Sequence, residues 1–555
     1  MLRWQAIVRA KPLATGNYGD GTAESYGYTS TKATNDANKN DNLRRLHIRL
    51  CRKGNEPDPN NPDKADKTQW SEEFIVTLGG TDGIEMRENH SYRLALSLTP
   101  SHLSAATLAT FPTWAETETP LETDNGGTDG YTVSTTADGK TTWNIYTAAG
   151  LAAFATAANA TDGSGVSLNA TLMSDIDLST VCGATAGDNG AAKSWIPIGS
   201  TYKADTPNLN YYTGTFNGQN HKIKNLYTNT NNSYESLFGS ISNGATIRNI
   251  KLENANVTGS NKVGALIGYI FDGTGTDTGT IIVSGNTVTS ATVAASNTTS
   301  GYDAGALIGH VDNSYAYIYG NTVNGTVTVT ANNKSAGGII GEMDNGHVGI
   351  DPEGNIIGNT VSGTVTISTT SGNNAGGIIG YMSDGEAIGN TVNGSGVTVT
   401  ANGSNAGGII GNLNDGTVSG NNVSGSVTVT ADLTSAGGII GSMAKGEATG
   451  NTVTSATITT GVYDAGGIIG EMRGGSASRN TVNGNTTIGN GYSGTLAGYI
   501  ASTATLTNNT VAKTVTVKEG QDSPTVAAST ENFVGSTNSS GGGTVTVTGN
   551  EVVEE

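Results

Sequence analysis

The sequence of 555 residues is poor in cysteine, proline, aromatic and charged residues. Aromatic residues make up 6% of the chain, so a broad globular core is unfavourable and a thin, repetitive core fits better. Charged residues make up only 14%, and Val, Ile and Thr are frequent, which is not the composition of a disordered chain. The only cysteines, Cys51 and Cys182, fall in different expected domains, so we expect two free thiols and no disulfide framework.

Long apolar runs and basic clusters are also missing. No stretch reaches the roughly 18 apolar residues of a membrane span, and the opening MLRWQAIVRA has neither the apolar segment nor the cleavage site of a signal peptide. Residues 101–555 carry 14 basic against 34 acidic residues, within a net charge of −19 for the chain. No basic stripe could neutralise phosphates, so nucleic acid is not an expected partner.

The most abundant feature is an apolar phrase that repeats about every thirty residues. AGGIIGEM begins at Ala336, and each copy is followed by a turn and then by Gly-Asn-Thr-Val or a close variant. The glycine that closes each phrase stands at Gly268, Gly309, Gly341, Gly380, Gly411, Gly441, Gly470 and Gly498. Longer steps contain insertions, such as residues 347–357. A fixed period of this size indicates a solenoid.

One unit, residues 336–366, predicts three short strands separated by turns, which is one coil of a right-handed parallel β-helix. Stacked coils place like residues in columns about 4.8 Å apart. An internal column is expected for Val323, Val361, Val392, Val423, Val453, Val482 and Val511. A ladder of side-chain amides, at turns whose left-handed backbone Asn would tolerate, is expected for Asn286, Asn321, Asn359, Asn390, Asn421, Asn451, Asn480 and Asn509.

Two neighbouring isoleucines in the phrase do not fit simple alternation. Period 2 places Ile339 and Met343 inside and Ile340 outside, yet isoleucine recurs at both positions. Either a bulge at Gly341 buries both, or an apolar stripe faces outward for a partner.

The ends of the repeat region differ from it. Thr147 could cap a helix with Leu151, Phe154 and Ala158 on one face, and such a helix would cover the open end of the coils. The predicted domains are an antiparallel β-sandwich (1–112), a linker (113–142), a helical cap with the first coils (143–235), the repeat β-helix (236–520) and a C-terminal coil or cap (521–555).

The motifs of residues 143–509 resemble those of proteins with GLUG motifs. They are WIPIG at Trp195, GTFNGQNHKIKNLY at Gly214, SLFGSISNGATIRNI at Ser236 and the GALIG or GGIIG phrases. The resemblance implies a bacterial cell-surface or secreted protein, since the motif occurs in adhesins and in non-catalytic stalks of surface peptidases. ENHSYRLALSL and ATLATFPTWAE resemble the fimbrillin-like sandwich of fimbrial and lipoprotein adhesins. We therefore expect an extracellular or outer-membrane surface location, with an export signal and lipid anchor missing from this chain.

The chemistry-bearing residues form no recognisable constellation. No catalytic, cofactor-binding or metal-ligating residue is predicted, and no cofactor. His310 and His347 are expected on the solvated surface, and His221 in a turn. Asp344, Asp384 and Asp415 recur at one turn, either as turn-forming residues or as an acidic column that holds a cation.

The third strand of each unit predicts two outward columns of Thr. They comprise Thr328/Thr330, Thr366/Ser368, Thr398/Thr400, Thr428/Thr430 and Thr457/Thr459. Thr suits exposed strands in any case, but a flat lattice could also bind ordered water, ice or a carbohydrate face. Scattered tyrosines such as Tyr269, Tyr381 and Tyr499 could stack on sugars, although they are not expected to share a column.

Three functions remain open. The first is a non-enzymatic surface adhesin, or an extended stalk that presents a β-helix binding surface to a host glycan or surface protein. The second is a carbohydrate-active enzyme, a polysaccharide lyase or hydrolase, which needs clustered carboxylates or a bound calcium on one face. The third is a purely structural stalk. The oligomeric state is not predicted.

Overall fold

The structure is a computed structural model that divides into two compact units, Met1–Thr128 and Asp129–Glu555. In the first unit it describes the backbone of five strands. In the second it describes residues 130–554, except 136–140, 161–162, 188–189, 200–210, 243, 272–278, 297–301, 372, 519, 521–523 and 538–543. Each unit is considered by itself.

The described strands of the first unit form two antiparallel sheets. β4 (His90–Thr99) pairs with β1 (Arg3–Arg9) on one side and with β5 (His102–Pro112) on the other. β2 (Arg45–Ile48) pairs with β3 (Phe74–Thr77). The described strands of this unit are therefore all paired antiparallel, as the alternating sequence predicts.

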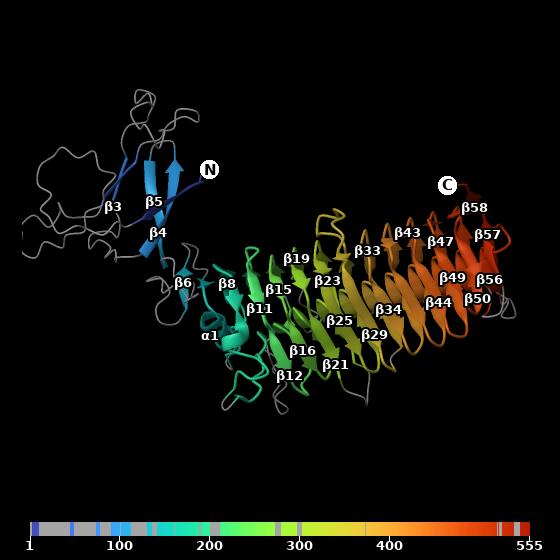
Figure 1. Cartoon of the computed structure of the whole chain (residues 1–555), viewed down its shortest axis with the longest axis horizontal. Coiled ribbons are helices and arrows are strands. Elements are labelled where there is room, and N and C mark those ends of the chain that lie inside the picture. The colour runs from blue at the N-terminus through green and yellow to red at the C-terminus, as the bar shows by residue number, and fades with distance from the viewer. Residues whose placement is uncertain are drawn as a thin grey trace, which may run out of the picture. The chain divides into compact units, whose positions relative to one another are not determined.

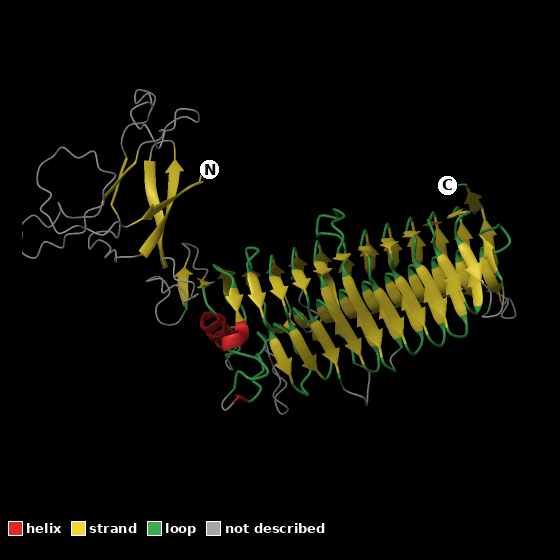
Figure 2. Ribbon diagram, viewed as in Figure 1, coloured by secondary structure: helices red, strands yellow, loops and turns green. Residues whose placement is uncertain are grey.

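The second unit is a parallel β-helix (Figures 1 and 2). One coil contains β30 (Asn374–Gly376), β31 (Ile379–Met382), β32 (Glu386–Ile388), β33 (Thr391–Gly394) and β34 (Thr398–Ala401). The prediction of three strands per unit is wrong, because turns and bends divide each unit into four or five strands. The sheet that contains β33 has 12 strands, which at about 4.8 Å per strand gives a rod roughly 50 Å long.

The valine column lies inside the rod, as predicted. Val361 pairs in register with Val323 and with Val392, and the column continues through Val423, Val453 and Val482 to Val511. Every member is fully buried. Each side chain therefore packs against its equivalents above and below, which a single coil could not provide.

The asparagine ladder is also present and extends one step further than predicted, to Asn550. Each Nδ2 donates to the Oδ1 of the next asparagine at 2.8–3.1 Å. The same Oδ1 accepts the backbone N–H of the preceding asparagine, as between Asn390 and Asn421 at 2.9 Å. The left-handed backbone belongs to the residue before the ladder, such as Gly420 or Arg479, rather than to the asparagine itself.

The apolar phrase is two strands joined by a bend at Gly338 and Ile339. β26 (Ser335–Gly337) ends before this bend and β27 (Ile340–Val348) begins after it. Ile339, Ile340 and Met343 are all fully buried, so the hypothesis of an outward apolar stripe is wrong. Ile340 and Glu342 pair with Ile379 and Tyr381 at the same offset, so the register shows no bulge at Gly341. The bend between β26 and β27, rather than the predicted bulge, accounts for the burial of both isoleucines.

The bend explains why glycine recurs in the phrase. A Cβ on Gly376 would lie 1.8 Å from the carbonyl oxygen of Ile379, and the glycines at the same position of other coils meet the same obstacle. Any side chain there would prevent the backbone from folding back on itself so closely.

The helical cap is present. α1 (Ala148–Ala158) begins after Thr147, whose side chain accepts from the N–H of Gly150 at 3.1 Å. Phe154 on its buried face lies 5.8 Å from Phe216, between ring centroids, and so closes the first coils. No helix among the described residues has the length and hydropathy of a membrane span.

Both ends of the rod add strands beyond the repeats. β6 (Tyr131–Thr135) and β7 (Thr141–Ile145) form a hairpin, and β7 pairs with β8 (Asn169–Leu172) in parallel. Of the predicted linker, residues 131–135 and 141–142 are thus strand residues that extend the sheet of the first coil. At the other end β57 (Val545–Thr548) and β58 (Glu551–Val553) complete the last coil.

Truncation of one ladder residue tests the contribution of the ladder. Asn421→Ala removes the acceptor of two Asn390 donors and the donor to the Ala387 carbonyl. Three buried groups lose partners, so we expect a loss of about 3 kcal/mol in unfolding free energy. Urea unfolding followed by circular dichroism measures it, and hydrogen exchange locates the loss to this part of the rod.

The next residue along the chain provides the control. The side chain of Asn422 is half-buried and its amide reaches only Ser424, at 3.4 Å, so Asn422→Ala should change the unfolding free energy by less than about 0.5 kcal/mol. Equal losses in the two variants would contradict a special role for the ladder.

Candidate functional site

The bend in each phrase creates a longitudinal crease on the outside of the rod, lined by two columns of side chains. The first column precedes the Ala-Gly-Gly of each phrase and comprises Asp303, Ser335, Asn374, Asn405, Ser435 and Asp464. The second precedes the Met position and comprises Tyr269, His310, Glu342, Tyr381, Asn412, Ser442, Glu471 and Tyr499. All side chains of the first column and several of the second are buried although they point away from the core.

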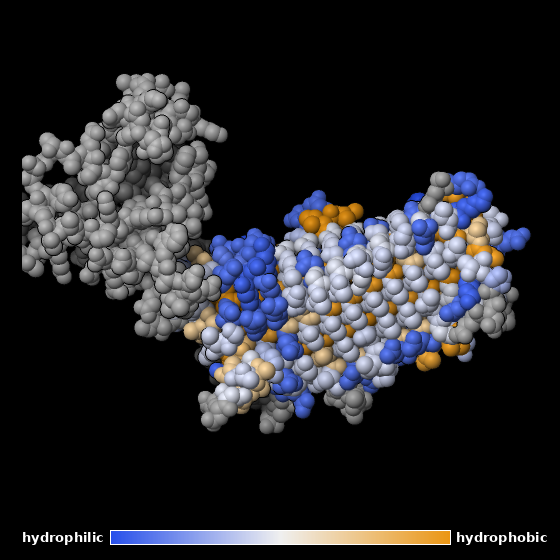
Figure 3. All heavy atoms as spheres, viewed as in Figure 1, coloured by the Kyte–Doolittle hydropathy of each residue, from blue (hydrophilic) through white to orange (hydrophobic). Residues whose placement is uncertain are grey.

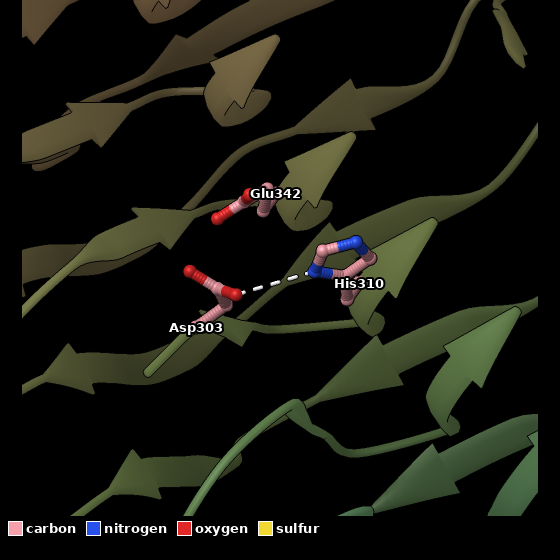
Figure 4. Close-up of side chains that lie close together, drawn as sticks. All are labelled: Asp303, His310 and Glu342. Atoms are coloured by element: carbon pink, nitrogen blue, oxygen red, sulfur yellow. Dashed lines mark hydrogen bonds and ion pairs between the residues drawn. The ribbon is translucent and has the colours of Figure 1, made fainter. Parts of the chain in front are cut away.

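Charged side chains gather at one point of the crease (Figure 4). Asp303 lies just before β22 (Ala304–Gly305), and His310 lies on β23 (Ile308–Tyr319). Glu342 lies on β27 of the following coil and points toward the same space (Figure 4). One ligand-type atom from each of the three lies within 4.8 Å of the other two, and all three residues are buried.

Both ring nitrogens of His310 face a carboxylate. Nδ1 lies 3.2 Å from Asp303 Oδ2, and Nε2 lies 3.0 Å from Asp344 Oδ2. Lys334 reaches in from the surface, with its Nζ 3.7 Å from Asp303 Oδ2 and in contact with Glu342 Oε2. These five residues, all from two neighbouring coils, are called the charged cluster below.

Burial and neighbouring charge shift the titration of the charged cluster. Burial, and then the negative charge of Asp303, raise the pKa of Glu342 to about 7. Burial alone would lower the pKa of His310, but the bonds to Asp303 and Asp344 outweigh it and raise that pKa above its ordinary value. The bond from His310 lowers the pKa of Asp344. The cluster therefore favours a protonated His310 beside an ionised Asp344.

Aromatic and basic side chains flank the charged cluster in the preceding coil. The ring of Tyr269 lies 5.4 Å from that of His310, edge to face, and its hydroxyl donates to Asp312 Oδ2 at 3.0 Å. Lys262 Nζ lies 3.6 Å from the centre of the Tyr269 ring, and burial lowers the pKa of this lysine.

A second acidic pair lies further along the crease. Burial, and then the charge of Glu471, raise the pKa of Asp464 to about 7. Arg473 contacts both Glu471 oxygens, at 2.8 and 3.0 Å. Ser442 donates to Glu471 at 3.3 Å.

A cavity of about 180 Å³ lies near the cap, beside Trp195, Ile196 and Tyr234. Buried Glu235 lines it and accepts a hydrogen bond from the Thr230 hydroxyl at 2.7 Å. Its other oxygen has no hydrogen-bond partner, and burial raises the pKa of this carboxyl.

The structure corrects the expectation for His310, which is 5% exposed rather than solvated. Its position varies along the repeat, as a surface position does, but the crease buries it. His347 is half-buried, stacks on Tyr317 and lies 2.7 Å from Glu386. His221 occupies the predicted turn region beside Asp175. The side chains of His47, His90 and His102 lie outside the described residues.

The repeated turn aspartates do not form one column. The N–H of Gly385 donates to Asp384 Oδ1, and the N–H of Gly416 donates to Asp415 Oδ1, which is turn chemistry. In the earlier coil Asn345 holds that position, and Asp344 lies one residue before it, facing His310. The hypothesis of an acidic column through Asp344 is wrong for this reason.

The Thr columns are in register as predicted, from Thr328 and Thr330 to Thr457 and Thr459. Tyr269, Tyr381 and Tyr499 share the second column of the crease. Tyr317 and Tyr319 lie further along β23 and Tyr492 pairs with Asp464, so the scattered tyrosines as a set do not share one column, as predicted. Cys182 is a buried free thiol, and Cys51 lies outside the described residues.

The fold and the repeat define the second unit as a parallel β-helix. No family model matches the chain, and no curated protein matches it. One solved structure is similar, that of "a putative immunoglobulin A1 protease from Bacteroides ovatus". The match has 17% identity and a TM-score of 0.29, and it covers 76% of this chain and 85% of the other.

Asp464 predicts a pH dependence of stability. Its folded pKa of about 7 exceeds the ordinary 3.8, so the folded state binds more protons than the unfolded state between these values. The stabilisation of the folded state that results from this raised pKa is complete below about pH 4 and is lost as pH rises through about 7. We therefore compare the unfolding free energy of Asp464→Asn with that of wild type at each pH. This difference should favour the variant by on the order of 1–3 kcal/mol more at pH 8.5 than at pH 4.

The matched neighbours support this substitution, since Asn405 and Asn374 occupy the same column and bond to each other at 3.1 Å. Asp432→Asn, at an exposed turn, is the control and should show no such pH difference. Unfolding curves of the three proteins at both pH values measure the effect, and parallel behaviour of Asp464→Asn and wild type would contradict it.

Proposed function

We propose that this chain is a non-enzymatic bacterial cell-surface protein, an adhesin or extended stalk, whose β-helix presents a binding face to a host glycan or surface protein. The observation that carries the proposal is the uninterrupted stack of coils, whose valine column and asparagine ladder from Asn286 to Asn509 are buried. Such a rod holds its outward residues at fixed spacing without reorganisation on binding. The GLUG-type and fimbrillin-like resemblance of the sequence supports the surface location.

The Thr face is the surface that best fits this role. Its strands include β29 (Thr364–Thr369), β34, β39 (Thr428–Ala431) and β44 (Thr457–Thr460). Figure 3 shows the side of the rod on which these strands lie, and its surface is pale, that is, of intermediate hydropathy. Hydroxyls repeat about every 4.8 Å along the rod, so weak contacts to a repetitive ligand would add over many coils.

A carbohydrate-active enzyme is the second candidate. The paired carboxyls of Asp303 and Glu342, with a pKa of about 7 for Glu342, favour it, since a general acid needs such a raised value. The two residues are 1% and 5% exposed, however, which leaves a polymer little access. Release of new reducing ends or unsaturated products from uronic-acid polymers would establish this activity, and Glu342→Gln should then abolish it.

Binding of the full chain to a glycan array and to immobilised host-surface proteins tests the proposal. Thr398→Lys combined with Thr457→Lys places two bulky charges on the Thr face, on either side of one intact coil. We expect at least a tenfold loss of affinity for the ligand found, because the lysines break the flat lattice of hydroxyls.

The control pair is Thr391→Lys with Thr452→Lys, which has the same spacing on the adjacent sheet. It should leave binding unchanged. Equal losses from both pairs would show that the Thr face is not the binding face, and no binding at all would leave only a structural stalk.

A further inference from the structure

A neutral His310 cannot satisfy both of its carboxylate neighbours by hydrogen bonds. A neutral imidazole carries one N–H and one lone pair. If Nε2–H donates to Asp344 at 3.0 Å, the Nδ1 lone pair faces the Asp303 carboxylate at 3.2 Å. Two acceptors in contact repel each other, so either a second proton or a cation must lie between Nδ1 and Asp303.

The three side chains around this point match the ligands of a transition metal. Imidazole nitrogen and carboxylate oxygen bind zinc at about 2.0–2.2 Å, and two ligands of one ion then lie about 3.2–3.5 Å apart. Asp303 Oδ2 and His310 Nδ1 already have this separation, and one ligand-type atom of Glu342 lies within 4.8 Å of both. Figure 4 shows the three groups directed at one space.

A buried atom without a partner also points to a ligand here. Asp303 Oδ1 has no hydrogen-bond partner among the described residues, although the side chain is only 2% exposed. An unsatisfied carboxylate oxygen at this depth costs free energy, and a metal ion would remove that cost.

In this structure the ammonium group of Lys334 is the positive charge next to these carboxylates. Its ammonium lies against Asp303 and Glu342, but its side chain is 35% exposed. A long flexible stem can carry the ammonium back to water when a divalent ion with stronger bonds enters.

We propose that Asp303, His310 and Glu342 bind a divalent transition-metal ion of the zinc class, with Lys334 displaced to solvent. Asp344 orients the imidazole from behind through Nε2–H, the usual arrangement of a metal-bound histidine. Asp303 and His310 come from one coil and Glu342 from the next, so the ion links neighbouring coils. A nitrogen ligand selects zinc, cobalt or nickel over calcium or magnesium, which prefer oxygen.

Calorimetric titration of the metal-free full chain with Zn²⁺, supported by the visible absorption of a Co²⁺ complex, tests the proposal. Wild type should bind one ion in the cluster, and His310→Gln should weaken that binding at least 100-fold. Lys334→Met should strengthen it about tenfold, since the competing ammonium is gone. Asp344→Asn should weaken it about tenfold, as for other outer partners of metal-bound histidine.

His347→Gln is the matched control, because this histidine also faces a carboxylate, Glu386, but lies outside the cluster. The His347→Gln variant should bind Zn²⁺ with the same affinity as wild type. Circular dichroism checks that each variant is folded, and the gain in Lys334→Met does not depend on a disruptive change. Equal affinity of wild type and His310→Gln, or no tightening in Lys334→Met, would overturn the proposal in favour of an ion-pair network without metal.

Discussion

Register between neighbouring coils is the constraint on which the rest of this structure depends. A coil of about thirty residues has too few apolar side chains to bury them by itself, so each must lie over its equivalent in the next coil. The valines do this in the interior, and the asparagines do it at a corner with hydrogen bonds of 2.8–3.1 Å. A shift by one residue would place polar groups inside and break every rung of the ladder. Insertions such as residues 349–358 are tolerated because they project from a turn and return the chain to the same columns.

The glycines of the phrase also shape the outer surface of the stacked coils. Because Gly376 and its equivalents carry no Cβ, the chain folds sharply between two strands, and outward side chains seven residues apart meet. This contact shields both side chains from water, although neither side chain lies in the core. Neutral pairs tolerate this burial well, whereas an acid there gains a raised pKa, as at Glu342 and Asp464. The same bend that permits burial of both isoleucines therefore also sets the electrostatics of the crease.

Much of the fold could be predicted from the sequence because identical residues at a fixed period imply stacking. The valine column, the asparagine ladder and the cap helix at Thr147 all follow from the spacing of residues. The prediction failed where it assumed straight strands: it treats the phrase as one strand and places His310 on the solvated surface. The burial of His310 and Glu342 depends on the bend after Gly337, and the contact of His310 with Asp344 depends on a one-residue offset from Asp384. The sequence did contain a signal of this burial. Titratable residues occur at two variable positions that lie seven residues apart, on either side of a glycine pair.

The repeat itself shows what the crease requires for folding. Along the two columns the fold accepts Ser, Asn and Tyr, and Asn374 and Asn405 satisfy each other with a single bond of 3.1 Å. Small or neutral polar side chains therefore suffice at these positions. Five charged residues in two adjacent coils cost desolvation that a neutral set would avoid, and they leave a buried oxygen of Asp303 without a partner. Since folding does not require these charges, the concentration of five of them in two adjacent coils supports the proposed cation site rather than a contribution to the rod.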